Sequence, residues 1–486
     1  MTPFNLVEES WIPVRYLDDR NELVSLETAF RDSAKIADLD CPPHERISLM
    51  RLLVCIAQAE LGAPETPDEW NGFGDNLDVR GPAYLRREDV FPHFNLFGDG
   101  PRFLQVHIRP DAEPVKSSKL IPHLATGNNP TLLDHEGGNE ERCLMPARLA
   151  LALLAFQCFY PLYGAGYKGK GPCVDGNMVH TLLIGPNLKL TIISNCLSLD
   201  WIAPYFSSHA MGRPIWEMDP SASGFSDSAT KSYLGRLVPR HRNLELLPDG
   251  SGFWLEKTGL EYPRFEEARE TTATVVVITK KDVQERRLLS ARLDRAVWRD
   301  LHLMTVLRQG KTEDARAPLN LHVQWQRQQG EFQLWVGALV TDMKAKIYDT
   351  VESSLSIPIS MFEGAGRSRY EQGVQYADGL SNQLYGAVKQ YGSALKNESP
   401  PTEEAKRHYW HSLNQQSGLL LDIIRNPELM AGLSFGEGND PWTEAVRRSV
   451  GDAYEQVCPR QTPRQIQAYA AGLKVLNSKS KKKKAS

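Results

Sequence analysis

Residues 161–176, with the sequence PLYGAGYKGKGPCVDG, combine glycines and lysines in a way suited to binding an anion. Glycine lets the backbone approach a ligand closely, because no Cβ stands in the way. Lys168 and Lys170 favour a negatively charged ligand, and successive backbone N–H groups can form an anion-binding nest. A flexible surface loop can have the same composition, so this stretch by itself leaves both interpretations open.

Two other places carry residues that could bind a metal. Asp134 and His135 are adjacent, and neighbouring residues on a strand point to opposite faces. His408 and His411 are three residues apart in a helical pattern, without the inward-facing Glu partners typical of di-metal bundles. A metal-dependent nuclease or hydrolase using Asp134 and His135 is an alternative hypothesis, but it needs a converging acidic cluster that the sequence does not show.

Known catalytic and cofactor motifs are not found. The string GAGYKG at 164–169 matches G-x-G-x-x-G, but it follows a helical run and opens no evident helix, so it is weak as a dinucleotide site. Neither lysine of the stretch is followed by Ser or Thr, which excludes a Walker loop, and no G-x-S-x-G or H-E-x-x-H motif occurs. These residues specify no enzyme active site and also do not exclude one, and we expect no metal or cofactor.

Length and composition indicate a globular protein of two or three domains, since 486 residues exceed what one hydrophobic core usually supports. Residues 366–486 hold 17 Lys+Arg and 12 Asp+Glu, a balance of +5, against 39 and 48 in the remainder, a balance of −9. This asymmetry indicates contact with a polyanion, although part of the excess is the KKKK run near the end.

The compartment follows from the cysteines and the apolar runs. The seven cysteines are scattered without a C-x-x-C pair, which is typical of a reduced, cytosolic protein. The N-terminus does not have the pattern of a signal peptide, and no apolar run approaches the length of a membrane span. We expect a soluble, cytoplasmic protein without a membrane partner.

The elements that must position the glycine-rich stretch begin with a strand pair near the N-terminus, across a turn at 18–21. Helical periodicity over 44–62 predicts a core helix, and an apolar run at 146–160 predicts a helix leading into the stretch. A strand at 271–279 precedes a basic run, 280–295, which continues into an amphipathic helix predicted over 287–307. Its spaced basic residues are either a solvated face or suited to phosphates. A hairpin is expected over 324–340, followed by a helix starting at Thr341 or Asp342.

The texture changes after residue 365. Helical patterns at 372–395, 402–415, 418–425, 441–457 and 462–476 are separated by short turns, which predicts an antiparallel bundle. The predicted fold class is α+β: a large mixed α/β domain over 1–365, then a C-terminal antiparallel four-helix bundle over 366–478. Residues 479–486 form a disordered basic tail.

Several segments together resemble one known family. They are FNLVEESWIPVRY at the start, the helix at 44–62, GNNPTLLDH at 127–135, the glycine loop at 164–171, AVWRDL at 296–301 and the C-terminal bundle. In this order and spacing they resemble the large subunit of the type I-E CRISPR Cascade surveillance complex, the CasA family. The resemblance covers essentially the whole chain, although this chain lacks the cysteine-rich zinc element of some relatives.

The resemblance implies a non-catalytic subunit of an RNA-guided antiviral complex. The N-terminal domain would dock to the complex, read the protospacer-adjacent motif (PAM) through the minor groove of double-stranded DNA, and start duplex opening and R-loop formation. The implied partners are the other Cascade subunits, the 5′ end of the guide CRISPR RNA, the target duplex and a recruited helicase-nuclease. A scaffold that joins other subunits without touching DNA is a further alternative.

The resemblance also assigns roles to residues. The loop that docks to the complex would be Thr131, Leu132, Leu133, Asp134 and His135. The minor-groove surface would be Gly164, Ala165, Gly166, Tyr167 and Lys257. A strand-separating wedge at a hairpin tip would be Asp342, Met343, Lys344 and Ala345; these depart from the family's glutamine-bearing pattern, so Met343 or Lys344 would separate the strands. Phosphate contacts would come from Lys168, Lys170, Lys280, Lys281, Arg286, Arg287, Arg292 and Arg295, with the bundle also holding DNA.

Overall fold

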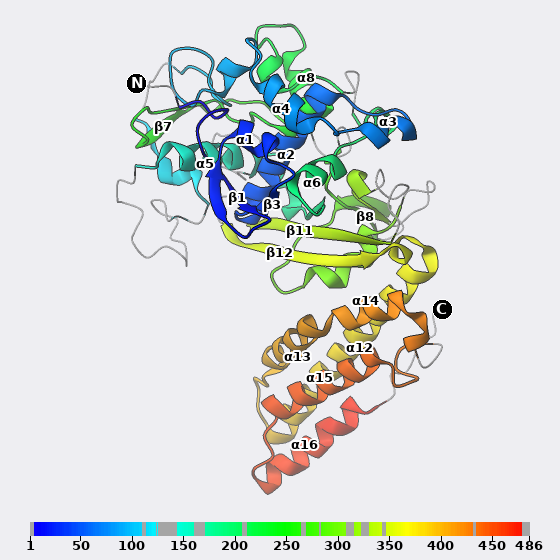
Figure 1. Cartoon of the computed structure of the whole chain (residues 1–486). Coiled ribbons are helices and arrows are strands. Elements are labelled where there is room, and N and C mark those ends of the chain that lie inside the picture. The colour runs from blue at the N-terminus through cyan, green and yellow to red at the C-terminus, as the bar shows by residue number, and fades with distance from the viewer. Residues whose placement is uncertain are drawn as a thin grey trace. The chain divides into compact units, whose positions relative to one another are not determined.

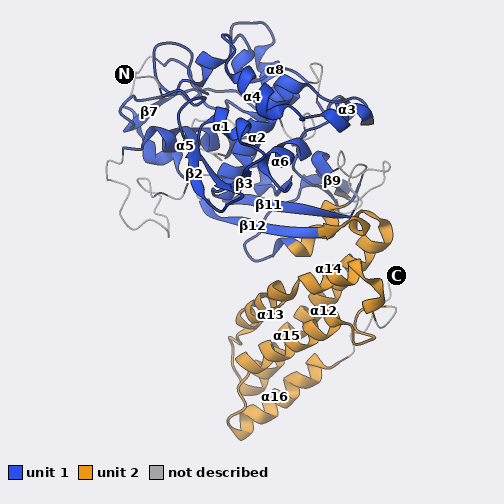
Figure 2. Ribbon diagram, in the orientation of Figure 1, with its two compact units in different colours: residues 1–297, 306–356 blue, residues 298–305, 357–486 orange. Residues whose placement is uncertain are grey.

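The computed structural model describes residues 4–108, 113–122, 124, 143–159, 171–206, 211–263, 269–280, 283–307, 315–321, 330–342, 347–430 and 434–478. The chain divides into two compact units (Figure 2). Unit 1 comprises residues 1–297 and 306–356, and unit 2 comprises residues 298–305 and 357–486. The boundary expected at residue 365 therefore leaves out a short segment, 298–305, that belongs with the C-terminal helices.

The strands form four three-stranded sheets in the described residues, with the orders β2-β1-β3, β10-β8-β9, β12-β11-β5 and β4-β7-β6. The predicted N-terminal strand pair is confirmed, with Pro13 opposite Leu23 in the antiparallel register. The strands are β1 (Ile12–Tyr16), β2 (Asn21–Val24), β3 (Ile36–Leu39), β4 (Val115–Lys116), β5 (His180–Leu183), β6 (Leu244–Leu246), β7 (Gly252–Leu255), β8 (Val275–Lys280), β9 (Val283–Leu288), β10 (Ala315–Arg316), β11 (Glu331–Thr341) and β12 (Ile347–Pro358).

Helices surround the long central helix α2 of unit 1 (Figure 1). The helices of this unit are α1 (Leu26–Arg31), α2 (Pro43–Leu61), α3 (Pro67–Gly72), α4 (Leu77–Leu85), α5 (Pro146–Phe159), α6 (Leu188–Ser194), α7 (Leu199–Ile202), α8 (Phe225–Lys231) and α9 (Tyr233–Leu237). The core helix predicted at 44–62 is confirmed as α2. It starts with Pro43, which suits a first helical position, and ends before Gly62, whose φ is +80°.

The core of unit 1 forms where α2 meets α5 and the β12-β11-β5 sheet. α2 is buried from Pro43 to Gln58, and α5 is buried from Leu149 to Phe159. The Arg46 guanidinium lies 5.1 Å from the ring centroid of Trp335 on β11, so the sheet packs against α2. A helix that is apolar on every side is expected to be buried on every side, and this holds for α5 from Leu149 to Phe159, where Gln157 is the polar exception.

Two sequence-based predictions in unit 1 are wrong. The segment after Thr341 is the strand β12, not a helix, and its partner β11 pairs with β12 and β5. The basic run at 280–295 contains the strand β9, which pairs antiparallel with β8 and places Lys280 opposite Val283. An N-cap signal at Thr341 or Asp342 and the spacing of the basic residues had suggested helices, but pairing with a neighbouring strand satisfies the backbone groups of both segments and overrides these local signals.

Unit 2 is a helical bundle, and the predicted fold class is confirmed. Its helices are α10 (Leu301–Met304), α12 (Gly364–Leu395), α13 (Thr402–Gln416), α14 (Gly418–Arg425), α15 (Pro441–Val457) and α16 (Pro463–Leu476). Trp442 at the start of α15 donates its Nε1–H to the Gly373 carbonyl near the start of α12, at 2.9 Å. Arg464 at the start of α16 instead donates to the Leu395 carbonyl at the end of α12, at 3.1 Å. α15 therefore runs parallel to α12, and α16 antiparallel to it.

The segment 298–305 contributes to the core of the bundle. Trp298 donates its Nε1–H to Asn414 Oδ1 at 2.9 Å and packs edge-on against Trp442, with ring centroids 5.5 Å apart. The Arg299 guanidinium lies 3.6 Å from the Trp410 ring centroid. The AVWRDL motif thus supplies a tryptophan and an arginine that connect α13 and α15.

Candidate nucleic-acid interface

The glycine loop lies outside the described residues between 160 and 170, but both of its ends are described. The loop includes six predicted site residues: Gly164, Ala165, Gly166, Tyr167, Lys168 and Lys170. α5 ends at Phe159, and the chain returns at Gly171 against the end of the same helix. Cys173 donates its backbone N–H to the Cys158 carbonyl at 3.0 Å. A Cβ on Gly171 would lie 2.3 Å from that carbonyl oxygen, so this close return requires glycine.

The chain leaving the loop, residues 171–179, is called the exit segment. The His180 ring, which follows it, has Nε2 2.9 Å from the Cys173 carbonyl and Nδ1 2.8 Å from Thr272 Oγ1. A carbonyl only accepts, so Nε2 carries the proton and Nδ1 accepts from the Thr272 hydroxyl. Burial lowers the pKa of His180 to about 4, and the ring is neutral at pH 7.

A buried charged cluster lies close to His180. Arg51 of α2 pairs with Glu270 and donates to the carbonyls of Arg236 and Leu237 at 2.6 and 2.9 Å. Arg236 of α9 pairs with the other oxygen of Glu270 at 2.7 Å. Burial would raise the pKa of Glu270, but the two guanidinium groups outweigh it and leave that pKa lowered. The cluster ties α2, α9 and the chain before β8 together.

Lys257 is exposed on a short segment that follows β7. Hydrogen bonds with Asn243 hold this segment in place. Glu256 donates its backbone N–H to the Asn243 carbonyl at 3.1 Å. The Asn243 side-chain amide donates to Glu256 Oε2 at 3.0 Å and to Thr258 Oγ1 at 3.4 Å. A Cβ on Gly259 would lie 2.0 Å from the His241 carbonyl oxygen. Lys257 therefore projects from a backbone fixed on both sides.

Gln157 connects this lysine segment to the base of the glycine loop. The residue is fully buried on α5, two positions before the helix ends. Its side-chain amide donates to the carbonyls of Leu104 and Arg242 at 3.1 and 3.0 Å, and its Oε1 accepts from the Arg242 N–H at 2.9 Å. Its own carbonyl lies 2.7 Å from Nδ1 of His241. The structure thus brings the base of the loop and the base of the Lys257 segment together.

The predicted docking loop also lies outside the described residues, together with its five named positions Thr131, Leu132, Leu133, Asp134 and His135. The chain on either side of it rests on the hairpin β6–β7. Ser117 donates its backbone N–H to the Ser251 carbonyl at 3.0 Å, and Leu144 donates to the Gly250 carbonyl at 3.2 Å. Gly250 has a φ of +75°, and a Cβ there would lie 2.5 Å from the Leu144 carbonyl oxygen. The same hairpin leads into the Lys257 segment.

The predicted wedge falls between two paired strands. β11 ends at Thr341 and β12 begins at Ile347, so Asp342 follows the last residue of β11. Met343, Lys344 and Ala345 lie outside the described residues. The resemblance implied a hairpin at this position, whereas local propensity had predicted a helix, and the paired strands agree with the hairpin.

The predicted phosphate contacts of the basic run do not form one face. On β9, Arg286 lies opposite Val277 and Arg287 opposite Val276, and neighbouring residues of a strand point to opposite sides. Arg287 pairs with Glu285 at 2.7 Å, and Arg292 pairs with Asp294 at 2.7 Å. Arg295 lies in the chain after β9, and Lys281 lies outside the described residues, as does the side chain of Lys280. A single phosphate-binding helix is therefore excluded.

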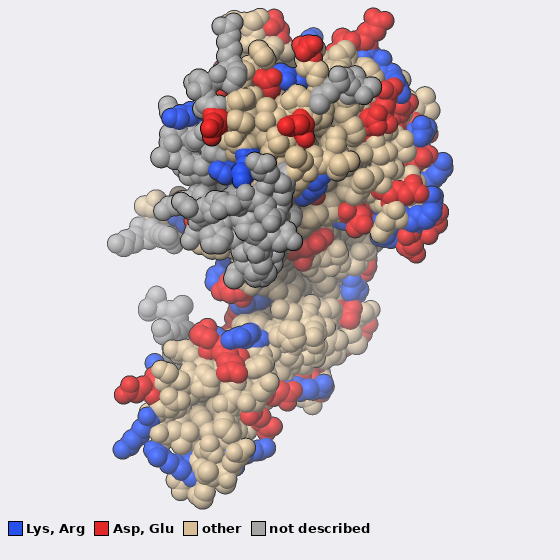
Figure 3. Space-filling view, turned by 90° about the vertical axis from the view of Figure 1, so that its left-hand side faces the viewer, with Lys and Arg blue, Asp and Glu red and all other residues tan. Residues whose placement is uncertain are grey.

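Charge is mixed over the surface rather than gathered. In the view of Figure 3, Lys and Arg alternate with Asp and Glu over the described residues of this face. Residues 366–478 of the bundle hold 12 Lys+Arg and 12 Asp+Glu, a balance of zero. The positive excess of the C-terminal section thus comes entirely from residues 479–486, which lie outside the described residues, and the bundle that was expected to hold DNA carries no net positive charge.

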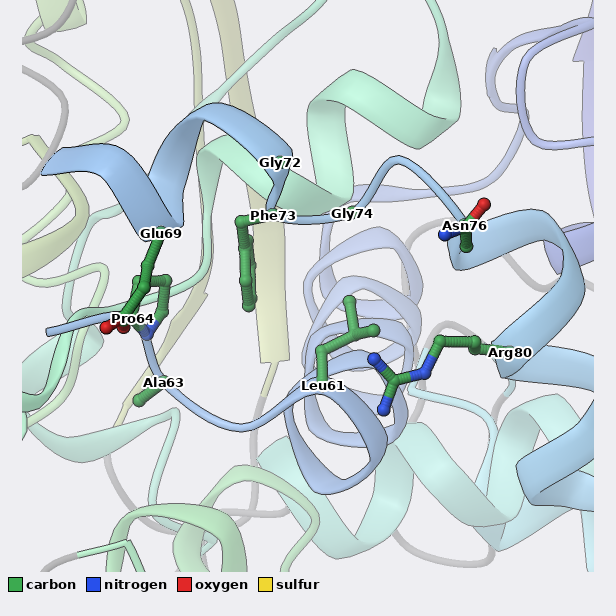
Figure 4. Close-up of a pocket in the computed structure, with 9 residues that line it drawn as sticks. All are labelled: Leu61, Ala63, Pro64, Glu69, Gly72, Phe73, Gly74, Asn76 and Arg80. Carbon is green, nitrogen blue, oxygen red and sulfur yellow. The ribbon is translucent and has the colours of Figure 1, made fainter. Parts of the chain in front are cut away.

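A pocket of about 250 Å³ opens where α2 ends, beside α3 and α4 (Figure 4). The ring of Phe73 and the side chain of Leu61 form apolar walls, and Arg80 lies beside Leu61. The Arg80 guanidinium pairs with Glu60 at 2.9 Å. The pocket is lined by polar as well as apolar residues and contains none of the residues predicted for the site.

The metal hypothesis rests on residues that the structure does not describe. Within the described ranges, no group of three or more His, Cys, Asp or Glu side chains is placed to hold a metal ion. Asp134 and His135 fall in the gap between 125 and 142. In the bundle, the His408 ring lies 3.7 Å from the Glu404 carboxylate one helical turn earlier.

Among the described helices, none is long and apolar enough to cross a membrane.

Comparisons with known proteins agree with this architecture. The family model for CRISPR-associated protein Cse1 matches residues 5–453. A CRISPR-associated protein CasA/Cse1 from Thermus thermophilus is 28% identical, covering 93% of this chain and 92% of the relative. The solved structure of Thermus thermophilus CasA has a TM-score of 0.76 at 22% identity, covering 98% of each chain.

A chain of a solved CRISPR RNA-guided surveillance complex has a TM-score of 0.70 at 19% identity, covering 98% of this chain and 100% of that chain. The chain described here belongs to the Cse1 family, also called CasA, the large subunits of the type I-E Cascade complex.

Sequence reasoning missed Gln157 and Asn243, and also Asn177, whose contacts are described below. Gln157 gave one signal, since it is the single polar residue in the apolar run 149–160. Asn177 follows Gly176, and both have a positive φ, so the pair is a turn signal. Asn243 gave no signal, because its role depends on contacts with residues 256–258 that the sequence does not reveal.

Proposed function

We propose that this subunit reads the PAM of target DNA for an RNA-guided surveillance complex and starts the opening of the duplex. The observation that carries the proposal is the link through Gln157 between the base of the glycine loop and the base of the Lys257 segment. Two protein elements that must touch the same minor groove need to be attached to the protein at a fixed distance from each other. The subunit is itself neither a nuclease nor another enzyme.

The subunit would read the PAM through close approach of the glycine-loop backbone to the minor groove and through the positive charge of Lys257. Minor-groove edges present a nearly degenerate pattern, so a glycine backbone and one lysine distinguish coarse pattern and groove width. The Glu256 carboxylate, next to Lys257, accepts hydrogen bonds from Asn243 and Thr258. This carboxylate is therefore turned toward the protein, and the lysine can present its charge to DNA. The expected recognition is permissive, with several related motifs accepted.

Opening would start at the tip between β11 and β12. Unstacking a base step costs a few kcal/mol, and an apolar wedge such as Met343 can offset this by replacing the lost stacking partner. β11 is the central strand of its sheet, between β12 and β5, and it pairs with β5 as far as Gly337. The tip is therefore attached to a strand that neighbouring strands hold in place. Local opening next to the PAM then starts the R-loop, while guide pairing reads the sequence.

The partners follow from the family and from the flanks of the docking loop. Residues 131–135 would attach the subunit to other Cascade subunits beside the 5′ end of the CRISPR RNA. Because both flanks rest on β6–β7, docking and the Lys257 segment share one hairpin. After R-loop formation the subunit would recruit the helicase-nuclease that degrades the target.

The test measures binding of a PAM-bearing duplex by the assembled complex. Lys257→Ala and Gly166→Asp should each weaken binding at least tenfold and reduce the preference for a PAM-bearing over a PAM-free duplex. Lys35→Ala is the matched control, since that lysine is exposed, pairs with Asp32 at 2.8 Å and belongs to none of the predicted sites. If both site variants bind like wild type, the minor-groove assignment is wrong, and a scaffold role without DNA contact is favoured.

A further inference from the structure

We propose that Asn177 is a positioning residue that holds the strand-separating hairpin at a set distance from the PAM-reading loop. This inference rests on the proposed function and adds a residue whose described contacts all lie within the subunit. Its side-chain amide donates to the Thr341 carbonyl at 3.0 Å. Its Oδ1 accepts from the Thr341 backbone N–H at 3.1 Å and from the Thr341 hydroxyl at 3.0 Å. One side chain thus binds both backbone groups of the last residue of β11.

The backbone of Asn177 is itself fixed, so its side chain has a defined origin. Asn177 donates its N–H to the Val174 carbonyl at 3.0 Å and accepts at its own carbonyl from the Ala291 N–H at 2.8 Å. Ser290 Oγ donates to the Gly176 carbonyl at 2.6 Å. The φ of Asn177 is +54°, a left-handed conformation that asparagine adopts more readily than most residues.

The contact between Asn177 and Thr341 joins the exit segment to the end of β11, beyond the last residues at which β5 pairs with β11. β5 and β11 pair from Leu183 opposite Leu334 to His180 opposite Gly337. Beyond Gly337, β11 runs on to Thr341, which is only 4% exposed. Over this last part of the strand, among the described residues, Asn177 connects it to the exit segment. The exit segment begins at Gly171, where the glycine loop returns to α5.

The geometry of DNA explains why this distance matters. Successive base pairs of one strand are about 3.4 Å apart along the helix axis. A tip displaced by that length would meet the next base pair instead of the one beside the PAM. Asn177 therefore governs opening rather than binding, because the loop and Lys257 have their own supports on α5 and β6.

Asn177→Gly provides the sharpest variant. Glycine keeps the left-handed backbone without strain and removes only the side chain. Asn177→Asp keeps the acceptor oxygens but loses the donor to the Thr341 carbonyl. Thr341→Val is the matched control, since it removes the hydroxyl bond and leaves both backbone groups of Thr341 in place.

Two quantities are measured with the assembled complex: the Kd for a PAM-bearing duplex, and the opening rate reported by a fluorescent base beside the PAM. Asn177→Gly should leave the Kd within about twofold of wild type and slow opening about tenfold. The opening rate of Asn177→Asp should lie between those of wild type and Asn177→Gly, and Thr341→Val should open the duplex at the wild-type rate. A duplex with mismatches beside the PAM, which is already open, should restore the Asn177→Gly complex to the wild-type rate of R-loop formation.

The inference is overturned if Asn177→Gly opens the duplex like wild type, or if the pre-opened duplex does not rescue it. It is also overturned if PAM binding falls as much as opening, since Asn177 would then support the loop itself. Failure of the proposed function gives a different result, because Lys257→Ala would then bind the PAM-bearing duplex like wild type. Melting temperatures of the isolated variants show whether each one folds.

Discussion

Unit 1 and the bundle bury different kinds of side chain at their centres. In unit 1, Arg51 and Glu270 pair across 219 residues of sequence, and Gln157 reaches Arg242 across 85. At the centre of unit 2 aromatic rings pack together, with Trp298 against Trp442, and their N–H groups each donate one hydrogen bond, to Asn414 and to the Gly373 carbonyl. Polar groups in a low-dielectric interior are costly unless fully bonded, so they specify one arrangement, whereas ring contacts tolerate small shifts.

The difference matches the work proposed for each unit. The glycine loop and Lys257 must be held at a set distance from each other. Directional hydrogen bonds fix both attachment points, from Gln157 to the Arg242 carbonyl and from Asn243 to Glu256. The bundle needs compactness, which packed aromatic and apolar area supplies together with the single hydrogen bonds of its tryptophans. Experiments that remove one kind of contact at a time can break this comparison or make it sharper.

The largest effect is expected from Glu270→Gln. This change leaves Arg51 and Arg236 buried without a negative partner, and breaking a buried pair typically costs about 3–5 kcal/mol. Urea unfolding of the isolated subunit measures the loss. Glu245→Gln is the matched control, because Glu245 also binds an arginine, Arg102, but is nearer the surface. Equal losses for the two variants would contradict a special role of the buried cluster.

The second effect is a loss of stability of unit 1 on acidification. Burial lowers the pKa of His180 to about 4 and of His241 to about 3, against an ordinary value near 6.5. The unfolded chain then binds more protons below pH 6.5, so this stability is complete above pH 6.5 and is lost as the pH falls toward 4. For His180 the difference corresponds to about 3 kcal/mol.

Glu270 adds to this only at lower pH, because its pKa is lowered and its contribution disappears below about 4.5. Hydrogen exchange of α5 and α12 amides, corrected for intrinsic rates, should show α5 losing protection between pH 7 and 5 while α12 keeps it. His180→Gln should reduce the pH dependence of α5. Parallel loss of protection in both helices would show that the two units do not differ.

A smaller effect is expected in the bundle from Trp298→Phe. Phenylalanine keeps a ring against Trp442 but loses the hydrogen bond to Asn414, which together should cost about 1–2 kcal/mol. Protection of α13 amides against hydrogen exchange measures it. A loss as large as that of Glu270→Gln would show that the bundle also depends on directional bonds.

The smallest effect is expected from Arg287→Ala on β9. Its pair with Glu285 is exposed, and such pairs contribute little, so the loss should be below about 0.5 kcal/mol. The melting temperature should stay within about one degree of wild type. A clear shift would mean that the surface charges of this hairpin contribute more than their exposure suggests.

The sequence predicted the bundle well, because its helices follow from local periodicity and turn residues. α14 and α15 have the predicted bounds, and α13 extends one residue further. The exception is α12, which begins at Gly364 instead of residue 372. Gly364 and Gly366 suggested a loop, but a Cβ on Gly366 would lie 2.2 Å from the Ser360 carbonyl oxygen, so glycine is needed there for packing.

The candidate site could be predicted only where local signals existed. The helix leading into the glycine loop could be located from its apolar run, whereas Lys257 was assigned only from the family resemblance and its role stays a prediction. The strands β9 and β12 were mistaken for helices, because their partners, not their own residues, decide their conformation. Contacts such as Asn177 with Thr341 join residues 164 positions apart, and no spacing rule on a single sequence reveals them.

The segment 298–305 also imposes an order on biosynthesis. Chains emerge from the ribosome at about 5–20 residues per second, and domains generally fold as units as they appear. Trp298 and Arg299 are translated before β11, β12 and every long helix of the bundle, so the aromatic side chain must wait for Trp442 near the end of translation. A nascent or truncated chain that stops before α15 contains Asn414, the acceptor for the Trp298 N–H, but lacks the Trp442 ring, so it exposes apolar surface of the kind that chaperones bind.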